Sequence, residues 1–138
     1  MNKSETLNKL NSMTKNTLME TLKIQYTKIG DNYLVATMPV NASVHQPMGL
    51  LHGGATVALA ESVGSTASHL FVDNKNFEVR GIEITANHLK SKREGIVTAT
   101  AKIIHKGKIT HLWEIKIVDE EGKMISICKL TNIILSKK

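Results

Sequence analysis

The chain has 138 residues, of which 41% are hydrophobic and 22% are charged, a balance that predicts one globular domain and excludes a wholly disordered chain. Aromatic residues make up only 4%, which argues against a stacking surface for single-stranded nucleic acid. The net charge of +6 comes from scattered lysines and arginines rather than from a basic run, so it selects no function by itself.

The sequence predicts neither a membrane-spanning segment nor a secretory signal. No apolar run approaches the roughly 20 residues that cross a bilayer, and the polar first residues do not resemble a secretory signal. Cys128 is the single cysteine, so no internal disulfide can form, which is typical of a reducing compartment. We therefore expect a cytoplasmic protein that binds neither membranes nor nucleic acids.

The N-terminal segment, residues 1–21, is expected to be helical. Residues 4–12 suit a polar helix that turns Leu7 and Leu10 inward. A second short helix is expected to follow Asn16, which would serve as its N-cap.

A β-hairpin is predicted next. Residues 22–29 suit an extended strand, residues 30–32 (Gly-Asp-Asn) a turn, and residues 33–40 a second strand. In the second strand the residues expected on one face are Leu34, Ala36 and Met38.

A long helix is expected over residues 54–71. Its side chains are small on nearly every side and include one acid, Glu61, among apolar neighbours. Small residues allow close approach to other backbone, so this helix should be buried against a sheet. Four runs rich in Ile, Val and Thr follow, over residues 79–89, 96–105, 109–118 and 124–135.

The order of these elements predicts the fold class. Two strands, one apolar helix and four more strands indicate an α+β domain with the helix on one face of an antiparallel sheet. The strand order does not follow from the sequence. Cys128 and Trp113 fall within strand patterns, so Cys128 is expected in the core and Trp113 in the core or at an interface.

The loop HQPMGLLHGG, residues 45–54, leads into the long helix. Gly53 and Gly54 allow close backbone approach, and the free N–H groups of the first helical turn can hold an oxyanion. Gln46 and His52 could orient a substrate carbonyl there. The alternative is a glycine-rich helix start whose histidine hydrogen-bonds only the backbone.

Glu61 suits nucleophilic or general-base chemistry. Ser65 lies one turn later on the same face, so it could hold a water. Each residue also has a structural interpretation: Glu61 could be satisfied by backbone or an ion pair, and Ser65 could donate to the carbonyl four residues back.

The spacing of Gly53 and Glu61 decides how they can cooperate. Eight residues separate them, or roughly 12 Å along a helix, whereas reacting atoms must lie about 3 Å apart. If they act together, two copies of the helix must run antiparallel across a two-fold axis, and the site requires a dimer.

Residues 46–65, QPMGLLHGGATVALAESVGS, resemble the active-site region of the hotdog-fold acyl-CoA thioesterases, the 4-hydroxybenzoyl-CoA and phenylacetate type. The resemblance is strongest to the bacterial branch of 1,4-dihydroxy-2-naphthoyl-CoA and enterobactin proofreading thioesterases, and it extends from about residue 22 to the C-terminal strand. It implies a single hotdog domain over residues 1–138, with a long helix wrapped by five or six antiparallel strands. It also implies a catalytic homodimer and a homotetramer.

The resemblance also implies roles for residues of the central segment. Gly53 would supply the oxyanion-hole N–H, and Gln46 and His52 would position the thioester. Glu61, from the partner subunit, would be the nucleophile or general base, and Ser65 would help to place the water.

Other residues would bind the substrate. By resemblance His88 is a pocket residue, and the backbone around Gly81 and Ile82 lines the pantetheine channel. Met48 stands where close relatives have an aromatic residue, which leaves the acyl preference open. The candidates for the nucleotide phosphates, each of which could equally be a solvated surface residue, are Lys90, Lys92, Arg93 and Lys108.

The resulting hypothesis is a thioester hydrolase for an aryl- or acyl-CoA, with 1,4-dihydroxy-2-naphthoyl-CoA of menaquinone biosynthesis as the first substrate to consider. No cofactor is expected, because a thiolate is a good leaving group, and no metal, because the six histidines lack metal-ligand spacing. The alternatives are a non-catalytic acyl-CoA or acyl-carrier binding protein, a housekeeping fatty-acyl-CoA thioesterase, and a dehydratase on the same fold.

Overall fold

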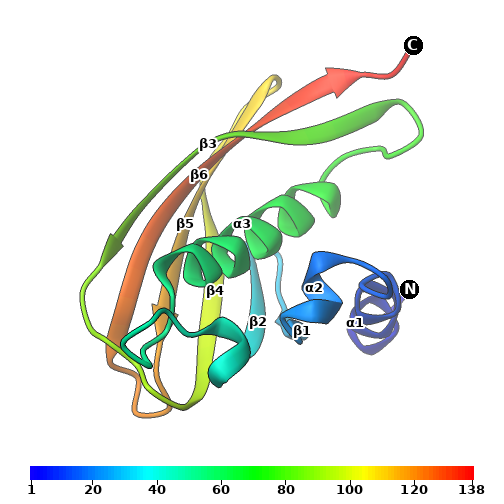
Figure 1. Ribbon diagram of the computed structural model, residues 1–138. Helices are drawn as coiled ribbons and strands as arrows, with labels where there is room; N and C mark the ends of the chain where they lie inside the picture. The colour runs from blue at the N-terminus through cyan, green and yellow to red at the C-terminus, as the bar shows by residue number, and fades with distance from the viewer.

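A six-stranded antiparallel sheet curves around one long helix (Figure 1). The computed structural model describes residues 1–138. In chain order the elements are α1 (Lys3–Ser12), α2 (Leu18–Thr21), β1 (Gln25–Ile29), β2 (Tyr33–Val40), the short 3-10 helix η1 (Ala42–Val44), α3 (Gly53–His69), β3 (Phe77–His88), β4 (Gly95–Lys106), β5 (Thr110–Val118) and β6 (Met124–Ser136). The predicted α+β class is confirmed.

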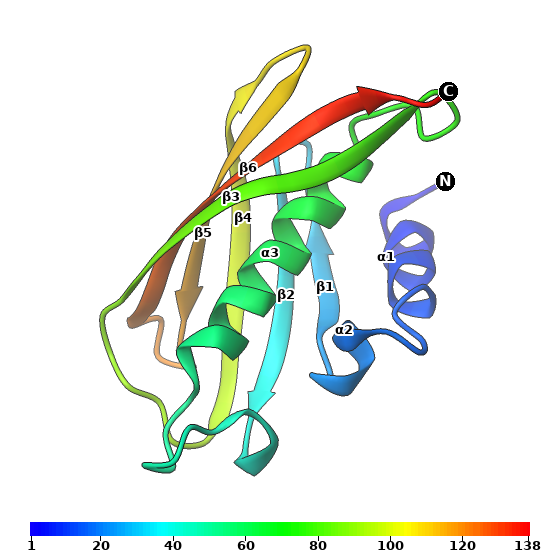
Figure 2. The same ribbon diagram turned by 45° about the horizontal axis from the view of Figure 1, so that its top comes forward.

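The strands are ordered β1-β2-β4-β5-β6-β3. After β2 the chain runs through α3 to the far side of the sheet, where β3 pairs with β6, the last strand (Figure 2). The chain then returns to pair β4 with β2, and β4, β5 and β6 follow as neighbours. Consequently β3 is an edge strand of 12 residues, and Ile82 at its middle is 58% exposed.

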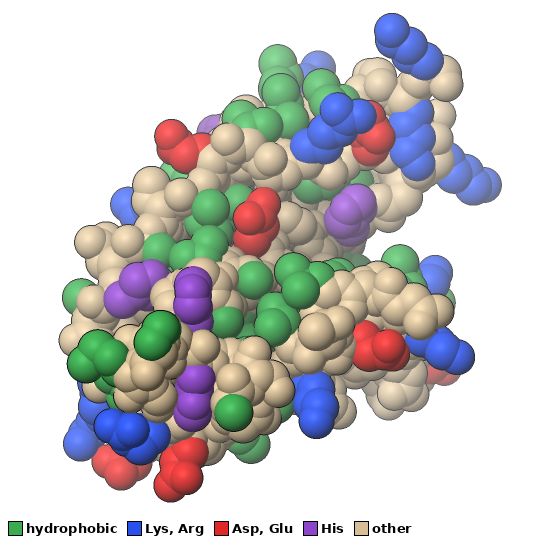
Figure 3. All heavy atoms as spheres, viewed as in Figure 1, with side chains coloured by type: hydrophobic (Ala, Val, Ile, Leu, Met, Phe, Trp, Pro, Cys, Tyr) green, Lys and Arg blue, Asp and Glu red, His purple; other side chains and the backbone are tan.

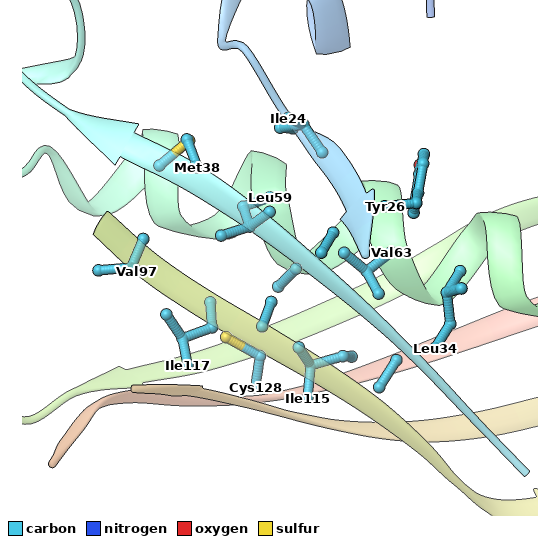
Figure 4. Packing of buried hydrophobic residues seen from close by; sticks show 14 of the residues in the cluster. Ile24, Tyr26, Leu34, Met38, Leu59, Val63, Val97, Ile115, Ile117 and Cys128 are labelled. Atoms are coloured by element: carbon cyan, nitrogen blue, oxygen red, sulfur yellow. The ribbon is translucent and has the colours of Figure 1, made fainter. Parts of the chain in front are cut away.

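The hydrophobic core lies between α3 and the concave face of the sheet (Figure 4). Leu59 and Val63 of α3 are fully buried there. The expected inward face of β2 is confirmed, since its three residues have no exposed surface: Leu34, Ala36 and Met38. Trp113 and Cys128 are core residues, as expected, and burial raises the pKa of the Cys128 thiol to about 11.

The predicted strands and the long helix are present, with small shifts at their ends. The long helix begins at Gly53 and ends at His69, because Leu70 serves as its C-cap. The N-cap of the short helix was wrongly assigned to Asn16: Thr17 is the cap, and its side chain accepts a hydrogen bond from the Met19 N–H. Asn16 instead adopts a positive φ of 63°, which suits a turn.

The N-terminal helices pack beside the first strand rather than over the sheet (Figure 2). Asn11 fixes this arrangement, since its side chain accepts from Tyr26 N–H at 2.8 Å and donates to Tyr26 O at 2.9 Å. The Asn11 side-chain amide thus satisfies the Tyr26 backbone N–H and C=O, as the backbone of a neighbouring strand would. None of the helices combines the length and apolar character that crossing a membrane demands.

Candidate active site

A pocket of about 320 Å³ opens at the start of α3. Five segments meet in it: the loop before α3, the first turn of α3, the end of β3, the loop after β3 with Lys90, and β6. The residues they contribute include Gln46, Leu50, Gly53, Thr56, His88 and Ser126. Histidine side chains gather on this part of the surface (Figure 3).

Gly53 presents a free backbone donor at the rim of α3. As the first helical residue it has no intrahelical acceptor, and its N–H makes no other hydrogen bond in the chain. The next amide, of Gly54, donates to His52 Nδ1 at 2.8 Å, so His52 is the N-cap. The free N–H lies at the positive end of the helix dipole, where it can stabilise an oxyanion.

His88 lies directly against Gly53. A Cβ on Gly53 would come within 2.8 Å of His88 Nε2, so only glycine fits at this helix start without displacing the ring. The other ring nitrogen, Nδ1, lies 2.7 Å from Ser126 Oγ, which fixes the orientation of the imidazole. The pocket therefore offers a backbone N–H and an imidazole nitrogen side by side.

Gln46 completes this side of the pocket. Its side-chain oxygen accepts from the Met48 N–H within the loop, which leaves the two amide N–H donors for a ligand. Met48 itself is 74% exposed and does not line the pocket. His52 does not line it either, because the ring turns back to cap α3. His52 therefore hydrogen-bonds the backbone of the helix start, which is the alternative that the sequence left open for it.

Glu61 and Ser65 lie in a second pocket, of about 370 Å³, farther along α3. It shares no lining residue with the first pocket, and its apolar wall includes Leu10, Met13 and Met19 of the N-terminal segment. None of the chain's five ion pairs involves Glu61. Within one chain the carboxylate and the Gly53 N–H are thus separate.

Ser65 has a free hydroxyl. Ser62, three residues earlier, donates to Ala58 O at 2.7 Å, which is the common arrangement of a helical serine. Ser65 makes no such bond, so its hydroxyl remains available beside Glu61.

Gly81 and Ile82 differ in what they face. A Cβ on Gly81 would lie 2.8 Å from Glu61 Oε2, so Gly81 is a neighbour of the carboxylate in its own chain. Ile82 follows at a bulge of the exposed edge. Neither residue lines the pocket at Gly53.

The basic candidates do not form one group. Lys90 pairs with Asp119 at 3.0 Å, and Lys92 pairs with Glu120. The Lys92 ammonium lowers the pKa of Glu120 to about 2, so that acid stays ionised. Arg93 pairs with no acid and reaches the turn at Gly49.

Lys108 lies apart from the other basic candidates. It lines a small pocket with Phe71, beyond the C-terminal end of α3. The structure therefore does not bring Lys108 to the start of α3 within one chain.

Ser126 and Thr56 line the pocket at Gly53 although the sequence did not single them out, and Asn132 lies opposite Gly81. Ser126 and Asn132 come close to His88 and Gly81 only because β6 pairs with β3. This pairing joins segments about 40–50 residues apart and leaves no local signal in the sequence. Thr56 follows the two glycines by one turn, and that spacing could have indicated it.

Known proteins with similar sequences indicate the family to which this chain belongs. The family profile described as "Thioesterase superfamily" matches residues 48–126, more than half of the chain. The 1,4-dihydroxy-2-naphthoyl-CoA hydrolase of Escherichia coli is 45% identical over 130 residues, which cover 94% of this chain and 95% of the relative. The chain belongs to the thioesterase superfamily.

Further relatives and solved structures are also thioesterases. The proofreading thioesterase EntH of Cronobacter turicensis is 42% identical, with 94% of each chain covered. A thioesterase structure from Pseudomonas aeruginosa superposes with a TM-score of 0.93 at 44% identity, covering 95% of this chain and 94% of that one. A thioesterase from Haemophilus influenzae gives 0.91 at 39% identity, covering 94% and 90%.

These matches confirm the hotdog fold and the family expected from residues 46–65. As a member of the thioesterase superfamily, the protein is a thioester hydrolase.

Proposed function

We propose that the protein hydrolyses an aryl- or acyl-CoA thioester to the free acid and CoA, with 1,4-dihydroxy-2-naphthoyl-CoA, on the route to menaquinone, as the first substrate to test. The observation that carries this proposal is the free Gly53 N–H beside His88 and Gln46. The similarity to the Escherichia coli hydrolase supports the choice of acyl group. The single buried cysteine suits a reducing, cytoplasmic setting.

The thioester carbonyl oxygen binds at the start of α3. The Gly53 N–H and the helix dipole stabilise the negative charge that develops on it, and the Gln46 amide donates from the loop before α3. Attack on the carbonyl carbon breaks the C–S bond, and CoA leaves as a thiolate that takes up a proton. Because the thiolate is a good leaving group, no cofactor has a role in this scheme.

Glu61 of the partner subunit delivers the attack by one of two routes. Either its carboxylate bonds to the acyl carbon and a water then hydrolyses the resulting mixed anhydride, or it takes the proton of a water that Ser65 helps to place and this water attacks the carbonyl carbon. The separation of the two pockets within one chain supports a shared site. The exposed edge strand β3, with Ile82 at its middle, offers a surface on which a second copy can pair. The catalytic unit is then a homodimer, and two dimers form the tetramer.

The nucleotide part of CoA lies outside the pocket at Gly53. Lys90 lines that pocket, but Arg93 is the basic candidate that is free of acidic partners, and it lies close to the loop at Gly49, so we assign it to a phosphate. Lys90 and Lys92 would first have to leave Asp119 and Glu120. Met48 is exposed on the loop and does not line the pocket, so its side chain must turn toward the bound substrate to contact the acyl group.

A thiol-release assay over a panel of aryl- and fatty-acyl-CoA esters tests the activity and ranks the substrates. Turnover with an aryl-CoA preferred supports the proposal. Stoichiometric binding without release of thiol would instead indicate a non-catalytic acyl-CoA binding protein. A preference for long fatty-acyl chains would overturn the assignment of the naphthoyl ester.

Glu61→Gln tests the chemistry itself. The substitution removes the charge and keeps the shape, so we expect kcat to fall by about two orders of magnitude or more while thermal unfolding is unchanged. The matched control is Glu20→Gln, an exposed acid on α2, which should retain full turnover. Near-normal kcat in Glu61→Gln would remove Glu61 from the mechanism.

A further inference from the structure

Asn132 on β6 carries a buried polar atom without a partner. The residue is 0% exposed, and its Nδ2 donates to Gly64 O at 3.2 Å and to Ser68 Oγ at 2.8 Å. Its Oδ1 is the only buried side-chain nitrogen or oxygen in the chain that makes no hydrogen bond. Buried polar atoms are nearly always paired, so this oxygen requires an explanation.

The orientation of the amide follows from its neighbours. Gly64 O can only accept, so the NH₂ group must face it. Ser68 Oγ accepts from Trp113 Nε1 at 2.7 Å, and its hydroxyl hydrogen is directed to His111 Nδ1 at 2.8 Å. The serine therefore also presents an acceptor to Asn132, and Oδ1 is turned toward β3.

The unpaired oxygen shares a small space with the Glu61 carboxylate. Asn132 lies opposite Gly81 in the β3–β6 register, and opposite residues place their side chains on the same face. A Cβ on Gly81 would lie 2.8 Å from Glu61 Oε2 and 3.6 Å from Asn132 Oδ1. Because glycine has no side chain, the two oxygens flank the same point. Both are acceptors, so they come together favourably only around a donor.

We propose that Asn132 is a positioning residue that acts on Glu61 through one water, an inference that rests on the proposed function. The water donates one O–H to Asn132 Oδ1 and the other to Glu61 Oε2. The carboxylate is thereby held in one orientation, and Oε1 remains for the attack. A side chain at Gly81 would displace the carboxylate from this arrangement, because its Cβ would lie 2.8 Å from Glu61 Oε2.

The test compares Asn132→Leu, which keeps the size and removes both polar atoms, with Ser68→Ala. Ser68→Ala removes a partner of Nδ2 and leaves Oδ1 in place, so it reports the structural contribution of the network. We expect kcat for the best CoA ester to fall about tenfold or more in Asn132→Leu, with KM nearly unchanged, because carboxylate orientation affects the chemical step. Ser68→Ala should keep the wild-type kcat.

A second readout does not require turnover. The carboxylate stretching band of Glu61, assigned by its loss in Glu61→Gln, should shift in the infrared spectrum of Asn132→Leu and not in that of Ser68→Ala. An unchanged band would overturn the proposal whether or not the protein cleaves any ester. Equal kcat losses in Asn132→Leu and Ser68→Ala would also overturn it, because the effect would then belong to the network as a whole.

Asn132→Asp keeps the proposal testable if the leucine variant does not fold. The new carboxyl group retains Oδ1 and lies opposite Glu61, so the two acids titrate as a pair and the acidic limb of the kcat profile moves to higher pH. A limb at the wild-type position contradicts the proposed contact. Absence of turnover in the wild-type enzyme would overturn the proposed function, and the infrared comparison would still decide the role of Asn132.

Discussion

His111 is held in the core by a hydrogen bond to Ser68 and by packing against aromatic residues. It is 2% exposed, and Phe71 meets its ring edge-on at 6.2 Å between centroids. Burial, reinforced by the positive charge of Lys106, lowers the pKa of His111 below its usual 6.5. The neutral ring can then accept the Ser68 hydroxyl hydrogen at Nδ1, which matches the geometry of the network.

The stability of the protein should therefore fall in mildly acidic solution. Because the folded-state pKa of His111 is lowered, the unfolded chain takes up a proton at a higher pH than the folded chain does. The contribution of His111 is present above pH 6.5 and is lost as the pH falls toward the folded-state pKa.

Thermal unfolding of the wild type and of His111→Gln, followed from about pH 7.5 to about pH 5.5, checks this expectation. The Tm of the wild type should drop more steeply, so that the difference between the two proteins shrinks at the acidic end. Parallel curves would show that His111 does not carry the effect.

Single residues also show where prediction from sequence ends. The roles of Gly53 and Glu61 could be proposed because their types and their eight-residue spacing are written in one continuous segment. The contact between Gly53 and His88 is different, since it depends on where the end of β3 lies relative to α3. The polar cluster around Asn132 likewise depends on the register between β3 and β6, which no local pattern specifies.

α3 approaches the sheet closely because of its small residues. At Gly64 a Cβ would come within 2.6 Å of Leu130 Cδ2 and 3.5 Å of Ile115 Cδ1, both in fully buried side chains. The expectation that this helix packs tightly was sound for that reason. The face at Gly64 is the one that sets the distance between helix and strands β5 and β6.

Gly64→Ala should destabilise the protein although alanine is the better helix former. The propensity gain is about 1 kcal/mol, whereas overpacking a filled core costs about 1–3 kcal/mol, so we expect a net loss of about 1 kcal/mol. Urea unfolding measures it. Leu130→Val shortens the side chain that the new Cβ would meet. It should therefore lower the free energy of unfolding less in the Gly64→Ala background than in the wild type. A more stable Gly64→Ala protein would show that the helix can move away.

Elements bounded by strong turn signals were predicted well, and so was the hairpin of β1 with β2, whereas the pairing of β3 with β6 was not predicted. The second strand matches β2, Tyr33–Val40, because Gly30 to Asn32 and Asn41 delimit an alternating pattern. The short helix shows the limit of such signals, since Asn16 and Thr17 are both good caps and only the backbone decides between them. The placement of β3 beside β6 follows from the crossing of α3 over the sheet, which is a property of the whole chain.

At the scale of the molecule, one subunit holds the groups of the proposed site in two separate pockets. The pocket at Gly53 has the donors and lacks a carboxylate, while the pocket at Glu61 has the carboxylate and lacks the free N–H. In the proposed dimer a second copy would pair at the edge strand β3 and bring the two sets of groups together. If the site is shared in this way, mixtures of inactive chains should recover a defined share of the activity.

Mixing Glu61→Gln with Gly53→Val chains, after subunit exchange, should restore activity. Half of the dimers are then mixed, and each mixed dimer has one intact site and one doubly altered site, so we expect about one quarter of the wild-type activity. A mixture of Gln46→Ala with Gly53→Val is the matched control, because both changes alter the same pocket and no dimer contains an intact one. If Gly53 and Glu61 of one chain acted together, neither mixture would gain activity, and demonstrated exchange without recovery would overturn the shared site.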